Sequence, residues 1–308
     1  MINSRKMIIL KLLLTLLIGL SLFTIIGWVI YKWVNRKPLE TLNTFQGSRA
    51  FKDVEYQVAL GPRIPGSQGQ QQLIQWVKDK LSKSGWDGSV QEVTINGHDI
   101  KNIIEKRPNS NSQNIPWIIL GAHYDSRLRA DRDSDSQKVQ LPVPGANDGA
   151  SGVAVLLELG RVIPRNLPIN LWLVFFDAED NGHIDGWDWS QGSRAFVKDL
   201  ATKPDAAIII DMIGDANLNI YLEGNSTRRL SEEIWAQAAK LGYKEFIPVV
   251  NYYLTDDHTP FLEQGIPAVD IIDFNYPYWH TSADTPDKVS AKSLEIVGKT
   301  LISWLKTY

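Results

Sequence analysis

The sequence of 308 residues contains no cysteine. Without thiols the chain can form no disulfide, no cysteine-ligated zinc site, no iron–sulfur cluster and no thiol nucleophile. It also lacks an excess of basic residues outside residues 1–37, since the remainder holds 26 Lys and Arg against 35 Asp and Glu, a net charge of −9. Nucleic-acid binding that is independent of sequence needs a basic surface, so we expect no nucleic-acid partner.

Long apolar runs are rare, and the clearest lies near the N-terminus. Between Lys11 and Lys32 stand 20 uncharged residues, which as a helix would span roughly 30 Å, the thickness of the hydrocarbon core of a bilayer. A cleaved signal peptide has a shorter apolar core and a small-residue cleavage site, neither of which is present here. We therefore expect residues 1–37 to be a membrane anchor with basic flanks, followed by a folded domain, residues 38–308, outside the cytoplasm.

In residues 38–308, β-rich apolar runs alternate with helical patterns. This order predicts a single α/β domain with a mostly parallel mixed central sheet flanked by helices. Apolar runs that are almost continuous are expected where both faces of a parallel strand are covered. The clearest strands are residues 117–122, 170–176, 206–210 and 268–272. The helices are expected at residues 70–84, 149–163, 227–241 and 290–306.

Ionisable side chains follow these strands or open the helix after one of them. They are His123, Asp148, Glu179, Asp180, Asp211 and His280. Ligands of open α/β sheets bind outside the carboxyl ends of the strands, so we expect the six side chains to converge there. Singly, each has an ordinary alternative, because Asp148 could cap a helix, Asp211 could be a solvated acid and His280 a packed histidine.

A cluster of His, Asp and Glu without Cys suits zinc. The adjacent pair Glu179 and Asp180 matters most, because two acids on an irregular turn can point in different directions. One can then bind the metal while the other acts as a general acid or base. The metal would keep its ligand ionised, and partial burial would raise the pKa of the base toward the working pH.

Six segments resemble the zinc aminopeptidase and glutaminyl cyclase superfamily in their order and spacing. They are GAHYDS (121–126), PGANDGASG (144–152), FFDAED (175–180), IDMIG (210–214), DDHTPF (256–261) and YWHT (278–281). The segment GPRIPGS (61–67) also resembles the one that precedes the first helix of glutaminyl cyclases. The resemblance covers about residues 45–306, and it implies a zinc enzyme that acts on the N-termini of peptides or proteins.

The resemblance to aminopeptidases implies two zinc ions, with Glu179 as the base that activates the attacking water. The ligands would be His123 and Asp211 on one zinc, Asp180 and His280 on the other, and Asp148 between them.

The resemblance to glutaminyl cyclases implies a single zinc ion instead. In these enzymes the N-terminal amine of a Gln substrate attacks its own side-chain amide, so no water nucleophile is needed. Glu179 would carry a proton from that amine to the departing ammonia, and Asp211 and Asp256 would complete a hydrogen-bonded acid network. The zinc ligands would be Asp148, Asp180 and His280.

Several details favour the cyclase. The segment TDDHTPFLEQGIP (255–267) lacks the Ser that aminopeptidases commonly carry before Asp-His, and Trp279 directly precedes His280, as in cyclases, where the ring lines the substrate pocket. Asp180 and Asp270 replace the Glu and His of animal cyclases, which matches bacterial cyclases.

Two further aromatic residues, Trp187 and Trp189, are candidates for the floor of the pocket, with packing inside a loop as the alternative. We therefore predict a zinc-dependent glutaminyl-peptide cyclotransferase with Trp279 in its substrate pocket. The alternatives are a two-zinc aminopeptidase and an inactive binding protein built on the peptidase fold.

Overall fold

A computed structural model describes residue 27, residues 44–107 and residues 115–308. The chain divides into two units, Met1–Thr44 and Phe45–Tyr308. The predicted anchor, residues 12–31, falls outside the described residues except for Gly27. In the part of the chain that the structure describes, no helix is long and apolar enough to cross a bilayer.

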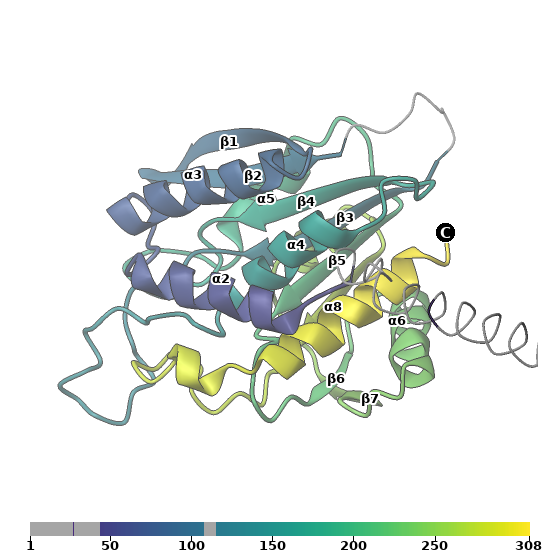
Figure 1. The fold of residues 1–308 in the computed structure, drawn as a ribbon. Helices are drawn as coiled ribbons and strands as arrows, with labels where there is room; N and C mark the ends of the chain where they lie inside the picture. The colour runs from purple at the N-terminus through teal and green to yellow at the C-terminus, as the bar shows by residue number, and fades with distance from the viewer. Residues whose placement is uncertain (1–26, 28–43, 108–114) are drawn as a thin grey trace, which may run out of the picture. The chain divides into compact units, whose positions relative to one another are not determined.

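The unit Phe45–Tyr308 is built around a six-stranded sheet with the order β1-β2-β4-β3-β5-β8 (Figure 1). The strands β4, β3, β5 and β8 are parallel to one another, whereas β1 and β2 run antiparallel along one edge. The bounds are β1 Asp87–Ile95, β2 His98–Lys106, β3 Trp117–His123, β4 Asn170–Phe176, β5 Ala206–Asp211 and β8 Ala268–Ile272. A separate parallel pair consists of β6 Ile220–Glu223 and β7 Phe246–Tyr252. The mixed sheet confirms the predicted α/β class.

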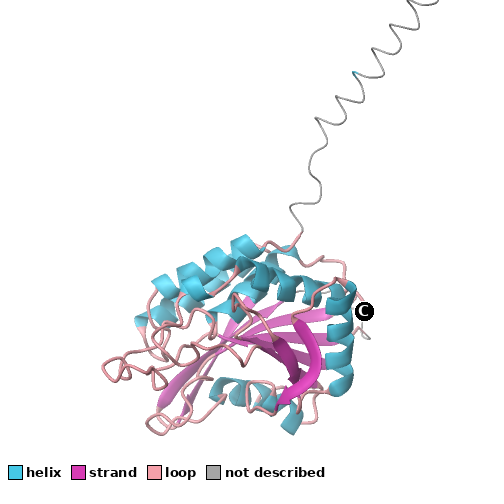
Figure 2. Ribbon diagram, turned by 90° about the horizontal axis from the view of Figure 1, so that it is seen from below, coloured by secondary structure: helices cyan, strands magenta, loops and turns pink. Residues whose placement is uncertain are grey.

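Helices lie on both faces of the sheet (Figure 2). The core on one face contains residues of α2 Gly47–Ala59, α3 Gln68–Ser82, α4 Ala150–Val162, α6 Arg228–Lys240 and α8 Ala291–Leu305. The core on the other face contains residues of α5 Gln191–Lys198 and the short α7 Thr259–Glu263. Both faces of the four parallel strands are therefore covered, which explains their almost continuous apolar sequences.

The side chains of β3 show how the sheet serves two cores. Ile118 and Leu120 pack with the α4 side, and Ile119, one residue out of phase, packs with Phe196 of α5 on the other. All three are essentially inaccessible to solvent. Burying such a side chain contributes about 1.5–3 kcal/mol, so these strands hold the carboxyl edge of the sheet firmly in place.

The last helix starts where its sequence indicates. Ser290 is the N-cap of α8, and its side chain accepts a hydrogen bond from the Lys292 backbone N–H at 3.2 Å. Such a cap satisfies one of the free N–H groups at a helix start and is worth about 1 kcal/mol. The helix predicted over residues 290–306 is therefore confirmed.

Candidate active site

Six ionisable side chains meet beyond the carboxyl ends of the parallel strands. β3 ends at His123 and β5 ends at Asp211, while Glu179 and Asp180 follow β4 on a turn. All six are buried, with at most 7% of the residue exposed: His123, Asp148, Glu179, Asp180, Asp211 and His280. The parallel strand order brings them together, as the sequence predicted.

Asp148 lies between two histidines. Its Oδ1 is 3.0 Å from His123 Nε2, and its Oδ2 is 3.8 Å from His280 Nε2. The same His123 nitrogen is 3.0 Å from Asp211 Oδ1, and the His280 nitrogen is 2.8 Å from Asp180 Oδ1. Asp148 therefore belongs to two groups, in each of which one donor atom per residue lies within 4.8 Å of the others.

The group of Asp148, Asp180 and His280 has the chemistry of a metal site. Asp148 Oδ2 and Asp180 Oδ2 are buried and have no hydrogen-bond partner among the described residues. Buried carboxylate oxygens without partners are costly, and a divalent cation would satisfy them. Burial lowers the pKa of His280 to about 3, so its ring is neutral, which is the form that ligates metals.

Two backbone features hold these groups close together. Gly149 follows Asp148, and a Cβ atom there would lie only 2.5 Å from His123 Nε2, so no other residue fits without a shift. His280 has a φ of 57°, in the left-handed region that non-glycine residues rarely adopt. Strain of this kind persists where the surroundings impose it, and it is concentrated at functional sites.

Asp148 does not act as a helix cap. The N-cap of α4 is Gly149, and no side chain accepts a hydrogen bond there. The carboxylate of Asp148 faces the histidines instead, so the ordinary alternative for this residue is excluded.

A cavity of about 350 Å³ opens beside these residues. Its wall combines acids with aromatic and apolar side chains, among them Glu179, Asp211, Asp256, Trp189, Phe274 and Trp279. The ring centroids of Trp279 and Trp189 lie 3.8 Å and 6.0 Å from that of His280. Both tryptophans therefore stand where the sequence predicted.

Trp187 does not line the cavity. Its ring stacks on that of His98, with 3.7 Å between the centroids, and it packs in a small cluster with Ile100 and Ala178. Trp187 and Trp189 are two residues apart on an irregular loop, which sends one ring toward the β1–β2 edge and the other toward His280. The packed-loop alternative thus describes Trp187.

Glu179 is placed to exchange protons. Its Oε1 accepts a hydrogen bond from Ser190 Oγ at 3.1 Å. Burial and the nearby charge of Asp256 raise the pKa of Glu179 well above its ordinary value, and burial raises the pKa of Asp211 to about 7. A buried acid whose pKa is raised accepts a proton more readily than an exposed one, which is a property that a general acid–base catalyst needs.

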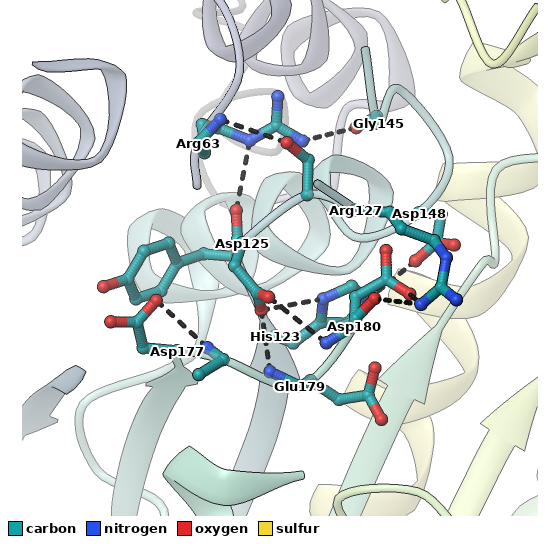
Figure 3. A network of polar contacts seen from close by, with 12 residues as sticks. Arg63, His123, Asp125, Arg127, Gly145, Asp148, Asp177, Glu179 and Asp180 are labelled. Atoms are coloured by element: carbon teal, nitrogen blue, oxygen red, sulfur yellow. Dashed lines mark hydrogen bonds and ion pairs between the residues drawn. The ribbon is translucent and has the colours of Figure 1, made fainter. Parts of the chain in front are cut away.

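Asp125, for which no role was predicted, supports the turn that carries Glu179 and Asp180 (Figure 3). Its carboxylate accepts hydrogen bonds from their backbone N–H groups at 3.0 and 3.2 Å. It also lies 3.4 Å from His123 Nδ1. A carboxylate at this distance from the ring nitrogen fixes the orientation of the His123 imidazole. Its position two residues after His123 in GAHYDS could have indicated from the sequence that Asp125 belongs to the site.

Asp284 performs a similar task on the other side of the site. Its Oδ1 accepts hydrogen bonds from the Asn147 N–H at 2.9 Å and from the Tyr276 hydroxyl at 2.7 Å, and its Oδ2 accepts one from the Asp148 N–H at 3.2 Å. The backbone of Asp148 is thereby held from a residue only four positions beyond His280.

Arg63, from the GPRIPGS segment, is completely buried and secures the loop before Asp148. Its guanidinium donates to the carbonyls of Tyr124, Pro144 and Gly145 at 3.1, 2.8 and 2.6 Å. Burial lowers its pKa to about 10, so it still carries its charge at neutral pH. These hydrogen bonds link the GPRIPGS segment to the loop that carries Asp148, although the two are far apart in sequence.

A sequence model of peptidase family M28 matches residues 102–305, which include all six clustered residues. The chain belongs to peptidase family M28. This M28 chain is similar to a solved glutaminyl cyclase of Tannerella forsythia, with 32% identity, a TM-score of 0.78, and coverage of 86% of this chain and 99% of the other.

Two further similar proteins are a zinc-dependent exopeptidase and a cyclotransferase-like protein. The M28 chain resembles a solved zinc-dependent exopeptidase of Parabacteroides distasonis, with 30% identity, a TM-score of 0.79, and coverage of 87% and 100% of the two chains. It is also 25% identical over 287 residues to a glutaminyl-peptide cyclotransferase-like protein of Bos taurus, covering 80% of this chain and 72% of the relative. The predicted superfamily is confirmed.

Proposed function

We propose that this M28 protein is a zinc-dependent glutaminyl-peptide cyclotransferase, which converts the N-terminal Gln of a peptide or protein to pyroglutamate with release of ammonia. The observation that carries the proposal is the buried Glu179, with its raised pKa, in a cavity beside the Asp148, Asp180 and His280 group. Similarity to a bacterial glutaminyl cyclase over most of the chain supports it.

One zinc ion is proposed, held by Asp148, Asp180 and His280. The two buried carboxylate oxygens without partners fit this assignment, and the similar exopeptidase is zinc-dependent. When bound, the zinc would polarise the side-chain amide carbonyl of the substrate.

The residues of the chain then have separate tasks. Glu179 takes a proton from the attacking α-amine and gives it to the departing amide nitrogen. The bond between the α-nitrogen and Cδ forms, the bond between Cδ and the amide nitrogen breaks, and ammonia leaves. Asp211 and Asp256, which line the same cavity as Glu179, would complete a hydrogen-bonded acid network with it. Trp279 and Phe274 line the cavity and exclude water, which would otherwise compete as a nucleophile.

A two-zinc aminopeptidase is the second candidate. The observation in its favour is the group of His123, Asp148 and Asp211, which also brings three donor atoms within 4.8 Å. In that case Glu179 would activate water against the peptide bond. An inactive binding protein is disfavoured, because the acid and every ligand position are present.

Two isosteric variants test the roles at the Glu179–Asp180 turn. Glu179→Gln removes the proton acceptor and should lower turnover by about 10²–10⁴-fold with zinc content near that of the wild type. Asp180→Asn should lose zinc, because a neutral amide is a poorer ligand than a carboxylate. Glu263→Gln, on exposed α7 surface, is the matched control and should change neither quantity. Loss of zinc from Glu179→Gln with activity restored by added zinc would mean that the roles are reversed.

We also propose that residues 12–31 anchor the protein in a membrane, with residues 38–308 as the catalytic domain outside the cytoplasm. The support is the run of 20 uncharged residues with interfacial Trp28, Tyr31 and Trp33 at its end.

A further inference from the structure

The loop that follows Arg127 is fastened to the His280 loop at two successive residues, Arg132 and Asp133, and it is braced internally by an ion pair. The Asp131 carboxylate accepts hydrogen bonds from Arg127 at 2.7 and 2.8 Å. The backbone N–H of Arg132 donates to the His280 carbonyl at 3.2 Å, and the Asp133 carboxylate accepts from the Ser282 N–H at 3.0 Å. The charged segment 127–133 is therefore held in a defined place at the active site.

This fastening sets the side chain of Arg132 against the cavity wall. Its guanidinium carbon lies 4.4 Å from the ring centroid of Trp279, which lines the cavity. Arg132 is nevertheless exposed. A guanidinium over an indole face is a favourable cation–π contact, and it leaves the planar N–H donors free to bind a carboxylate.

Arg132 differs from its neighbours in having no acidic partner. Arg127 is paired with Asp131, and Arg129 is paired with Asp185. Among the described residues, no carboxylate oxygen lies within 4.0 Å of a nitrogen of the Arg132 side chain, and the two acids beside it in sequence are engaged elsewhere. An exposed and oriented cation thus stands beside an otherwise acidic cavity.

We propose that Arg132 is a specificity-determining residue that selects peptides with a carboxylate directly after the N-terminal residue. The cavity of about 350 Å³ accommodates one side chain, and its inner wall is formed by acids such as Glu179 and Asp180. In this proposal the rest of the peptide leaves past the aromatic part of the wall, where the Arg132 guanidinium lies over Trp279. A carboxylate there can form two parallel hydrogen bonds with the fork of Arg132.

The negative charge of the rest of the domain would by itself disfavour acidic peptides. Residues 38–308 carry a net charge of −9, so acidic peptides are repelled in general. A preference for an acidic second residue therefore requires a local cation. The carboxylate can come from an acidic side chain or from the free C-terminus of a dipeptide, and the substrates below separate the two. The inference rests on the proposed action at peptide N-termini.

The test compares kcat/KM of the zinc-loaded full-length protein for Gln-Glu-Ala-amide and Gln-Lys-Ala-amide. The wild type should prefer the Glu peptide roughly 3–10-fold, mainly through KM, and the preference should shrink in high salt, as for an exposed ion pair. Arg132→Ala should bring the ratio close to one, Arg132→Glu should invert it, and Arg132→Lys should keep part of it. Gln-Ala as free acid against Gln-Ala-amide measures the C-terminal source separately.

Arg129→Ala is the matched control, since it removes a cation of the same loop that already has a partner; it should retain the wild-type ratio. A general structural defect lowers both rates and leaves their ratio unchanged, so the ratio reports on Arg132 alone. A wild-type ratio of one, or an unchanged ratio in both Arg132→Ala and Arg132→Glu, overturns the inference. If the proposed function is wrong and the protein is an aminopeptidase, the product is free Gln and no ammonia forms. The ratio of kcat/KM between the two peptides can still be measured in that case, from the release of Gln.

Discussion

Replacing Glu105 by Gln should remove a loss of stability that occurs as the pH rises. Glu105 lies on β2 with 0% of the residue exposed, and neither carboxylate oxygen has a hydrogen-bond partner among the described residues. Burial raises its pKa from 4.5 to about 7, an effect that Lys78 opposes and Asp87 reinforces. The carboxyl group is therefore easier to protonate in the folded chain than in the unfolded chain.

The sign follows from this difference. Below pH 4.5 the group is protonated in both states and makes stability no more dependent on pH. As the pH rises from 4.5 to 7 and beyond, the unfolded state ionises freely while the folded state must bury the charge, so stability is lost. The difference between 4.5 and about 7 corresponds to roughly 3 kcal/mol. Gln has nearly the same shape and does not titrate.

Urea unfolding followed by tryptophan fluorescence at pH 5 and pH 8 measures the effect. Between these values the wild type should lose about 2–3 kcal/mol more stability than Glu105→Gln. Glu92→Gln is the matched control, because Glu92 lies on the adjacent strand β1 with its side chain 66% exposed, and it should follow the wild type. Parallel pH curves for the wild type and Glu105→Gln would refute the reasoning.

The remaining predictions concern Asp284, Glu223 and the anchor. Asp284→Asn should weaken zinc retention by about 10–100-fold, because the amide NH2 group cannot accept the hydrogen bond that a carboxylate oxygen accepts from the backbone N–H at the same place. Competition with a chelator measures zinc retention. Unchanged retention would contradict the positioning role of Asp284. Burial alone would raise the pKa of Glu223, but His258, whose Nε2 lies 3.2 Å from its carboxylate, and hydrogen bonds from backbone N–H groups lower it to about 2. The ionised Glu223 therefore stabilises the fold above pH 4.5, and this stabilisation is lost as the pH falls toward 2. Glu223→Gln should remove up to about 3 kcal/mol of this loss of stability in acid. An unchanged acid unfolding curve would speak against the contact between Glu223 and His258. Deleting residues 1–37 should give a protein that remains active without detergent and no longer sediments with membranes, whereas aggregation of the truncated protein would argue that this segment packs into the domain.

Much of the sheet could be read from the sequence because its central strands are covered on both faces. The four predicted strands match β3, β4, β5 and β8 to within one residue at each end. The β1–β2 hairpin was missed, because its half-exposed strands mix polar and apolar residues without a clear run. A signal was present in Asn96-Gly97, where both residues have the positive φ that a tight hairpin turn requires.

The convergence of the six ionisable residues was also predictable, since parallel strands place their carboxyl ends at one edge. The hydrogen bonds that hold the backbone around these residues were not predictable. Asp284 and Arg63 reach backbone groups more than 60 positions away in sequence, and no local pattern reports such contacts. The orientation of Trp187 likewise depends on the path of an irregular loop, which composition does not determine.

The most direct test of the cyclase proposal is the analysis of products from a peptide with N-terminal Gln. The zinc-loaded protein is incubated with Gln-Ala-Ala-amide, ammonia is assayed, and the peptide is examined by mass spectrometry. The account predicts ammonia in equal amount to a pyroglutamyl peptide with every peptide bond intact, and a loss of this activity in Glu179→Gln. Free Gln together with Ala-Ala-amide, and no ammonia, would contradict the account and identify the protein as an aminopeptidase.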